Sequence, residues 1–152
     1  MKRAPGRGRI VIINFEKGGT AVPPEMVGTM RPCVVVQNNS MVRAPLITVV
    51  PISTTAPNPV GKQHHQLSHL SFREWPLDWD GQGIPRWAKC DYVTTVALDR
   101  CVDPYTKPRG KPRQFRHISV IKADLLAIEK CVLWSLGIDP ISHIPPTPEA
   151  GP

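Results

Sequence analysis

The sequence has no apolar run of about 18 residues, so nothing in it is predicted to span a membrane. The basic stretch of residues 1–9 is followed by an apolar segment too short for a signal peptide. The four cysteines form no Cys-x-x-Cys pair, and three of them lie in apolar segments, which favours reduced core thiols over a metal site. We therefore expect a cytoplasmic protein without a cofactor.

Acidic residues are also scarce: the chain has 12 Asp and Glu residues but 19 Lys and Arg residues, which gives a net charge of +7. This excess favours a polyanionic partner, either a nucleic acid or an acidic protein, although a merely soluble basic domain would share it. The length of 152 residues and the hydrophobic content of 41% suit one domain with a modest core. The 18 prolines predict many turns and little continuous helix.

Short β-branched and apolar runs predict strands over residues 9–15, 31–37, 46–55 and 88–96. Residues 62–72 alternate weakly and predict a further strand. Together these patterns favour a small, strongly bent antiparallel sheet or barrel with one terminal helix. We expect a basic flexible segment over 1–8, one domain over 9–138 and a proline-rich disordered tail over 139–152.

One helix is expected, over residues 122–136, because apolar residues recur there at helical spacing. Ser119 is the expected N-terminal cap, Asp124 suits the positive end of the helix dipole, and Gly137 suits the stop. This helix is expected to pack on the sheet and to carry no chemistry.

Residues 31–55 predict a strand-loop-strand unit with chemistry at one end. Arg31 begins the first strand, and Ser53 and Thr54 end the second. If the two strands pair antiparallel, Arg31 and Ser53 fall at the same end of the sheet. A guanidinium beside hydroxyl groups on a rigid edge is a plausible phosphate site. An ion pair of Arg31 with Glu25 or Asp91 is the alternative interpretation.

Basic residues gather between residues 102 and 116, where they are expected to attract phosphate without reading sequence. They are Lys107, Arg109, Lys111, Arg113 and Arg116. A solvated charged hairpin is the alternative. Lys89 and Asp91 are two residues apart on a predicted strand and should therefore point to the same face.

Histidines and tryptophans offer weaker signals. A solvated or RNA-facing histidine pair is favoured over a metal site at His64, His65 and His69. An irregular loop over residues 73–87 carries three tryptophans, Trp75, Trp79 and Trp87. Their rings suit base stacking, but covering the end of a small barrel or an interface is the favoured interpretation.

With these motifs in order, the chain resembles the MazF/PemK toxins of bacterial toxin–antitoxin modules over most of residues 8 to 137. The resemblance is carried by Gly8-Arg9-Ile10-Val11, Pro24-Glu25, Arg31-Pro32 with its valine strand, Val50-Pro51-Ile52-Ser53, Ala88-Lys89-Cys90-Asp91 with Thr94-Thr95-Val96, and Arg109-Gly110-Lys111. It implies an SH3-like β-barrel that forms a homodimer. It also implies a metal-independent endoribonuclease that cuts single-stranded RNA and is neutralised by a cognate antitoxin.

The resemblance also implies roles for individual residues. Arg31 matches the family's catalytic arginine, and Ser53 stands where relatives carry a catalytic threonine. Glu25 resembles the loop glutamate, and Lys89 and Asp91 match an Arg-Cys-Asp motif with proton-transfer roles, lysine replacing arginine. Residues expected to bind RNA are Thr54, His64, Lys107, Arg109, Lys111 and Arg113. The alternative from another class is a non-enzymatic SH3-like binding module or a gyrase-targeting toxin like CcdB.

Overall fold

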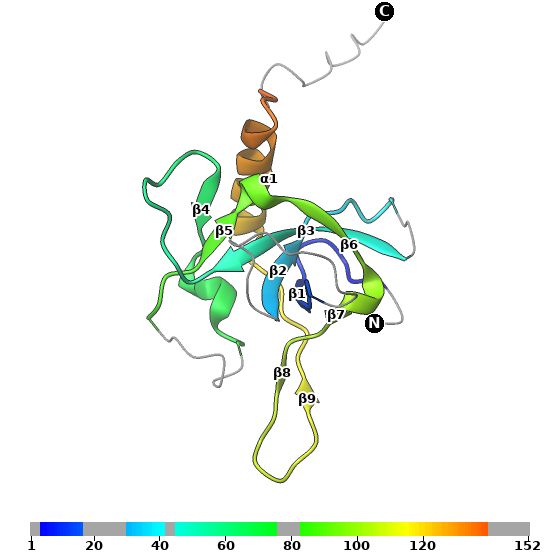
Figure 1. The fold of residues 1–152 in the computed structure, drawn as a ribbon. Helices are drawn as coiled ribbons and strands as arrows, with labels where there is room; N and C mark the ends of the chain where they lie inside the picture. The colour runs from blue at the N-terminus through cyan, green and yellow to red at the C-terminus, as the bar shows by residue number, and fades with distance from the viewer. Residues whose placement is uncertain (1–3, 17–29, 42–44, 76–82, 140–152) are drawn as a thin grey trace, which may run out of the picture.

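A computed structural model describes residues 4–16, 30–41, 45–75 and 83–139 of the chain. In these ranges the strands are β1 (Ile10–Ile13), β2 (Arg31–Val35), β3 (Leu46–Ser53), β4 (His64–Gln66), β5 (Trp87–Lys89), β6 (Thr94–Ala97), β7 (Cys101–Val102), β8 (Tyr105–Thr106) and β9 (Gln114–Phe115). The helix α1 (Lys122–Ser135) and the short 3₁₀ helices η2 (His69–Phe72), η4 (Cys90–Tyr92) and η5 (Leu98–Arg100) accompany them (Figure 1). The predicted class, mainly β with one C-terminal helix, is confirmed. No helix in the described ranges has the length and apolarity needed to cross a membrane.

One antiparallel sheet runs in the order β4-β5-β3-β2-β1-β7, and β6 also pairs with β3. The long strand β3 holds this sheet together, because it pairs with β2 on one side and with β5 and β6 on the other. Strand β6 leads through η5 into β7, which pairs with β1. This segment therefore touches both β3 and β1 and curls the sheet, as Figure 1 shows.

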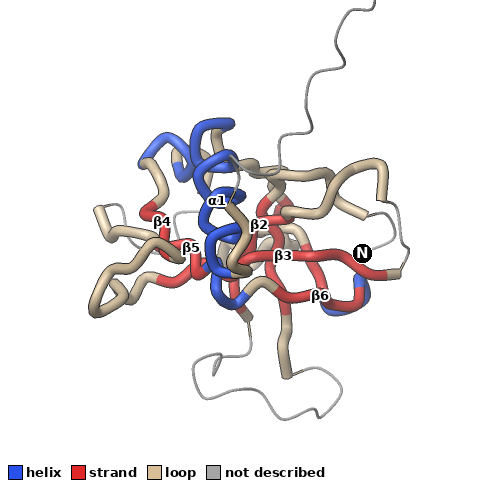
Figure 2. Tube along the Cα trace, turned by 90° about the horizontal axis from the view of Figure 1, so that it is seen from above, coloured by secondary structure: helices blue, strands red, loops and turns tan. Residues whose placement is uncertain are grey.

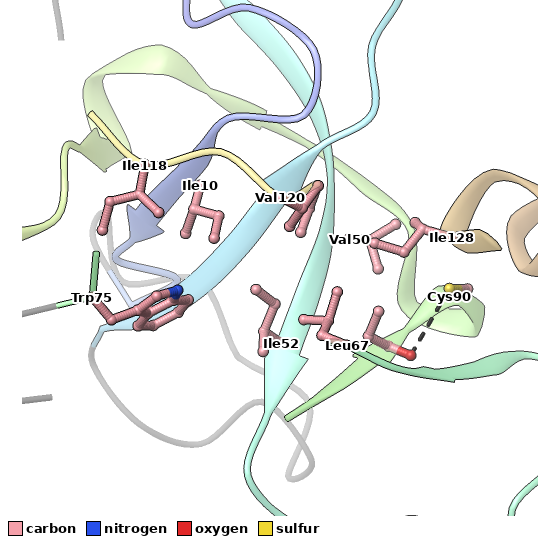
Figure 3. Packing of buried hydrophobic residues seen from close by; sticks show 11 residues of the cluster. Ile10, Val50, Ile52, Leu67, Trp75, Cys90, Ile118, Val120 and Ile128 are labelled. Carbon is pink, nitrogen blue, oxygen red and sulfur yellow. Dashed lines mark hydrogen bonds between the residues drawn. The ribbon is translucent and has the colours of Figure 1, made fainter. Parts of the chain in front are cut away.

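The central strands are buried on both faces, which explains why their sequences are almost continuously apolar. Alternate residues belong to two separate clusters. The first cluster faces α1 and includes Ile10, Val50, Ile52, Trp75 and Ile128 (Figure 3). The second lies on the other side and includes Val11, Ile13, Cys33, Val49 and Val96. The prediction that cysteines lie in the core is confirmed for Cys33, Cys90 and Cys101, which are buried.

Helix α1 lies against β4 and η4, and Figure 2 shows it crossing the sheet. Asp124 anchors its first turn. This buried carboxylate accepts hydrogen bonds from the Ser68 N–H (3.0 Å) and the Ser71 hydroxyl (2.5 Å), and it lies 2.9 Å from His65 Nε2. Ser71 Oγ in turn accepts from the Ile121 N–H at 2.9 Å. The network therefore ties the start of α1 to β4 and η2.

Two expectations about local structure are wrong. Residues 88–96 do not form one strand, because η4 interrupts them between β5 and β6. Ser119 does not cap α1, since the N-cap is Ile121 and Ser119 forms an isolated bridge with Arg9. The expected stop is confirmed: Gly137 follows the C-cap with a φ of 72°, a conformation that favours glycine. Residues 62–72 form a short strand and then η2, so the expected strand covers only part of them.

The basic segment forms the hairpin β8–β9, with Tyr105 opposite Phe115 and Thr106 opposite Gln114. It projects away from the body of the sheet, below β7 in Figure 1. The cations predicted to attract phosphate are exposed on it and around it, at Lys107, Arg109, Lys111, Arg113 and Arg116.

Candidate functional site

A cavity of about 490 Å³ lies where β2 begins and β3 ends. Its polar lining includes two guanidinium groups and three hydroxyl groups, from Arg31, Arg86, Ser53, Thr54 and Thr55. Aromatic and apolar side chains complete the described lining, among them Ile12, Ile52, Trp75 and Tyr105. None of the described lining residues is Asp or Glu. The described lining therefore offers guanidinium and hydroxyl groups, which are donors that suit an anion.

The strand register explains why Arg31 and Ser53 meet. Strands β2 and β3 pair antiparallel with Cys33 opposite Pro51, so two further steps along the same register bring Arg31 level with Ser53. Residues opposite each other in an antiparallel pair project to the same face, with Cβ atoms about 5 Å apart. The predicted juxtaposition of Arg31 and Ser53 at one end of the sheet is therefore confirmed.

The Ser53 hydroxyl is held by the turn that follows β3. Its Oγ accepts a hydrogen bond from the Thr55 N–H at 3.1 Å. A hydroxyl has one donor and two acceptor positions, so this bond orients the oxygen and leaves its O–H group to donate elsewhere. A phosphate oxygen in the cavity is a suitable acceptor.

Two further predicted catalytic residues, Lys89 and Asp91, lie with His64 in a second group beside the cavity. Ser53 pairs with Trp87 of β5, and Lys89 stands two residues farther along that strand, opposite His64 of β4. Two residues of a strand span about 7 Å, and alternate residues share a face. Ser53, Lys89 and His64 therefore lie along one face of the sheet. Asp91 follows in η4, with Oδ1 3.9 Å from His64 Nε2.

The expectation that Lys89 and Asp91 share a strand face is wrong, because Lys89 ends β5 and Asp91 belongs to η4. Neither Lys89, His64 nor Asp91 is among the described residues that line the cavity. Glu25 and Trp79 lie outside the described residues. Of the predicted catalytic set, the structure therefore brings Arg31 and Ser53 into the cavity, and Thr54 of the predicted RNA-binding set with them.

Tyr105 connects the cavity to the basic hairpin. Its side chain lines the cavity, and the Arg113 guanidinium stacks over its ring at 4.6 Å. The Phe115 ring meets it edge-on at 5.9 Å. One exposed cation of the hairpin, Arg113, therefore lies directly beside a residue of the cavity, where it can attract a polyanion.

The histidines do not form one cluster. His64 Nδ1 accepts from the Gly61 N–H at 3.1 Å, whereas His65 is engaged with Asp124 and His69 is exposed in η2. His64 and His65 are adjacent in β4 and so face opposite ways, which separates the expected pair. Within the described ranges, no three His, Cys, Asp or Glu side chains gather as a metal site would require.

The cysteine thiols are poor nucleophiles. Burial raises the pKa of Cys101 to about 11 and raises the pKa of Cys33 well above its ordinary value. Burial also raises the pKa of Cys90 in η4 and that of Cys131 in α1. Because the thiolate is the reactive form, these side chains serve packing at neutral pH.

Two cavity residues, Arg86 and Tyr105, were not predicted from the sequence. Arg86 stands before β5 in a segment without periodicity, and its neighbours in space come from a different part of the chain. Trp75 was expected to cover the end of a barrel or an interface. Its ring is buried in the first core cluster and also lines the cavity.

Residues 6–127 match the family model of the PemK-like, MazF-like toxins of type II toxin–antitoxin systems. The match spans well over half of the 152 residues. The chain belongs to this toxin family. No curated protein sequence matches it significantly.

Solved structures agree on the fold. A mycobacterial endoribonuclease in complex with its cognate antitoxin is 17% identical, with a TM-score of 0.57, covering 90% of this chain and 98% of the other. The Mycobacterium tuberculosis toxin MazF-mt6 is 15% identical, with a TM-score of 0.55 and coverages of 86% and 98%. MazF from Deinococcus radiodurans is 15% identical, with a TM-score of 0.57 and coverages of 90% and 99%. At these identities the likeness shows a shared fold with MazF toxins.

Proposed function

We propose that this toxin is an endoribonuclease that cleaves single-stranded RNA through attack of the RNA's own 2′-OH, without a metal ion. The observation that carries the proposal is the meeting of Arg31 and Ser53 in one cavity at the end of the sheet. Membership of the toxin family and the endoribonucleases among the structural relatives support it.

The chemistry requires three functions. The 2′-oxygen attacks phosphorus and loses its proton, the bond from phosphorus to the 5′-oxygen breaks, and that oxygen gains a proton. The products are a 2′,3′-cyclic phosphate and a 5′-OH. Arg31 neutralises the charge that develops on the non-bridging oxygens, since a guanidinium stays charged and donates two parallel hydrogen bonds. Ser53 donates its hydroxyl hydrogen to the same phosphate.

Proton transfer is assigned to groups outside the described cavity lining. Asp91 is the proposed base, and Lys89 assists the departing 5′-oxygen or binds phosphate. Both lie on the side of the cavity toward β4, where Lys89 shares a sheet face with Ser53. Glu25 is a second carboxylate candidate for this function. A nucleotide that reaches from Arg31 toward Lys89 would bring its 2′-OH toward Asp91.

RNA is proposed to run from this face to the hairpin. Thr54 lines the cavity and His64 lies beside Lys89, so both suit contacts to the bound strand. The exposed cations of the hairpin, Lys107, Arg109, Lys111 and Arg113, bind backbone phosphates. Such contacts hold the strand in place and leave base selection to the shape of the surrounding surface.

Two protein partners belong to the proposal. A cognate antitoxin covers the RNA surface, as complexes of relatives with antitoxins suggest. A second copy of the chain forms a homodimer, in keeping with the family resemblance. Exposed apolar residues at the end of α1, Trp134 and Leu136, offer an apolar surface for one of these contacts.

The test is cleavage of a long RNA by the purified protein in EDTA, with products mapped by primer extension and end-group analysis. We expect cleavage with 2′,3′-cyclic ends, and we expect Arg31→Ala to lower the rate by about 10²–10³-fold while melting remains unchanged. Arg73→Ala is the matched control, because Arg73 is exposed and outside the described cavity lining.

Intact RNA after incubation with the wild-type protein, together with normal growth on its expression, would exclude the nuclease. The chain would then be a binding module on the same fold, such as a CcdB-like toxin. Full activity of Arg31→Ala would instead keep the nuclease and remove Arg31 from its site.

A further inference from the structure

An aromatic residue, Phe115, is exposed on the hairpin β8–β9, which projects from the body of the sheet (Figure 1). The residue is 55% exposed. Among the phenylalanine, tyrosine and tryptophan residues of the described ranges, only Phe115 and Trp134 are exposed. A single exposed apolar residue is common on a soluble protein and needs no ligand to explain it. The surroundings of Phe115 therefore decide what its ring can bind.

The base of the hairpin is anchored to the body of the protein. Pro104 is fully buried just before β8, and its carbonyl accepts a hydrogen bond from the Arg116 N–H at 2.7 Å. The neighbouring Asp103 carboxylate accepts from the Arg9 guanidinium, also at 2.7 Å. Phe115 directly precedes Arg116, so these contacts hold its backbone at a defined place while most of the residue stays exposed.

The two aromatic rings of the hairpin differ in what covers them. Tyr105 is partly buried, lines the cavity and carries the Arg113 guanidinium over its ring at 4.6 Å. Phe115 stands opposite Tyr105 and meets it edge-on, with ring centres 5.9 Å apart and planes at 63°. An edge-on contact covers at most one face of a ring. Because Phe115 is more than half exposed, its ring therefore presents a face to a planar ligand.

Exposed cations surround this ring. Arg113 and Arg116 flank it in the sequence, and Lys107, Arg109 and Lys111 follow the rest of the hairpin. Proteins hold single-stranded nucleic acid with this combination, since a base stacks on the aromatic ring and cations contact the phosphates on either side. The hairpin is also continuous with the cavity through Tyr105. A polyanion with planar groups therefore fits this surface better than an apolar ligand does.

We propose that Phe115 stacks on an unpaired base of the RNA strand that is cleaved at the cavity, and that this contact selects single-stranded over paired RNA. A base within a duplex has both faces covered by its neighbours, so it stacks on a protein ring only if the duplex opens. The cations attract both forms of RNA. Phe115 is a binding residue in this scheme, and the inference rests on the proposed action on RNA.

The test measures Kd for a single strand and for a duplex of the same sequence. Both contain the mapped cleavage sequence and carry 2′-fluoro sugars, which lack the attacking hydroxyl. Each base of the single strand is then replaced in turn by an abasic residue. Phe115→Leu keeps an apolar contact to Tyr105 without an aromatic face, whereas Phe115→Trp enlarges that face. Met41→Ala is the matched control, since Met41 is 63% exposed in the turn between β2 and β3, at the opposite end of these strands from the cavity.

For wild type we expect tighter binding of the single strand than of the duplex, and one abasic position that weakens binding about tenfold, as loss of one stacked base does. In Phe115→Leu the Kd for the single strand rises about tenfold, the abasic penalty disappears and the Kd for the duplex is unchanged. The slope of log Kd against log salt stays the same, because no charge is altered. Met41→Ala should match wild type in every measurement.

Phe115→Trp should increase the abasic penalty at the same position, because a larger ring stacks more strongly. This second variant decides the matter if thermal melting shows that Phe115→Leu does not fold.

An unchanged Kd for the single strand in folded Phe115→Leu, or an equal loss for single strand and duplex, would overturn the inference. An abasic profile of Phe115→Trp identical to that of wild type would do the same, and Phe115 would then be a packing partner of Tyr105. Failure of the nuclease proposal is distinguishable, because the wild-type protein would then leave RNA intact. The same binding measurements would in that case use a strand of mixed sequence.

Discussion

The cavity and the neighbouring group of His64, Lys89 and Asp91 are built in different ways. Arg31 begins β2 and Ser53 ends β3. Both strands are central and buried on both faces, so the core on each side determines the positions of these two residues. The second group belongs to the outer strands β4 and β5 and to the 3₁₀ turn η4, and Asp91 is exposed. Its support comes from α1, through Asp124 and through the Ser135 hydroxyl, which donates to the Cys90 carbonyl at 3.2 Å.

In the proposed mechanism, this difference gives one face of the sheet a rigid anion site and a more exposed group to which proton transfer is assigned. A phosphate clamp must be preorganised, because its value depends on donors being in place before charge develops. A proton-transfer group tolerates more freedom, since such contacts often tighten only when substrate binds. Four predictions separate the two regions.

The largest effect is expected for Asp91→Asn. If Asp91 accepts the 2′-OH proton, kcat for RNA cleavage falls by about 10³-fold while Kd for RNA changes little. Asp99→Asn, an equal change of charge at an exposed position of η5, should leave kcat unaltered. An unaltered kcat in Asp91→Asn would show that Asp91 does not take part in proton transfer.

Asp124→Ala tests whether α1 supports the second group. The substitution leaves the Ser68 N–H and the Ser71 hydroxyl without their acceptor, so the free energy of unfolding should fall by about 3 kcal/mol in urea titration. Glu129→Ala on the same helix removes only a half-exposed ion pair with Arg7 and should cost less than about 1 kcal/mol. An equal loss of unfolding free energy in the two variants would show that the buried network contributes no more to stability than the surface ion pair does.

Ser53→Ala removes one donor from the cavity. The expected result is a fall in kcat/KM of about 30-fold in a folded protein, because a single neutral hydrogen bond to the transition state is lost. Loss of the bond from the Thr55 N–H should lower the free energy of unfolding by no more than about 1 kcal/mol. Ser53→Thr should retain activity, since it keeps the hydroxyl and restores the residue implied by the family resemblance. Loss of activity in both variants would point to steric demands at this position.

The smallest effect is expected for the hairpin. Arg109→Gln combined with Lys111→Gln should weaken RNA binding about tenfold, lower the salt slope by about 1.4 and leave kcat at saturating RNA unchanged. The measurement is Kd by fluorescence anisotropy at several salt concentrations. A drop in kcat with unchanged Kd would instead place the hairpin in the reaction.

The sequence by itself determined much of the fold. Its apolar residues located β1, β2, β3 and α1. Burial on both sheet faces leaves a continuous apolar run, and burial of one helix face leaves apolar residues at helical spacing. The sequence also predicted that Arg31 and Ser53 lie close together. A short polar turn between two strands favours antiparallel pairing, and such pairing brings the start of the first strand beside the end of the second. Pattern could not show the break at η4, because Ala88–Val96 is as apolar and β-branched as an unbroken strand.

Only the tertiary structure decided which other side chains meet at this cavity. Arg86 comes to Phe72 and Trp75 through the pairing of β4 with β5, and Tyr105 reaches the cavity through the hairpin, so neither leaves a local signal. Asp124 was expected to act on the helix dipole, yet it binds three groups from β4 and the η2 segment. Periodicity reports which face of an element is buried, whereas the contacts across that face depend on how distant elements are brought together.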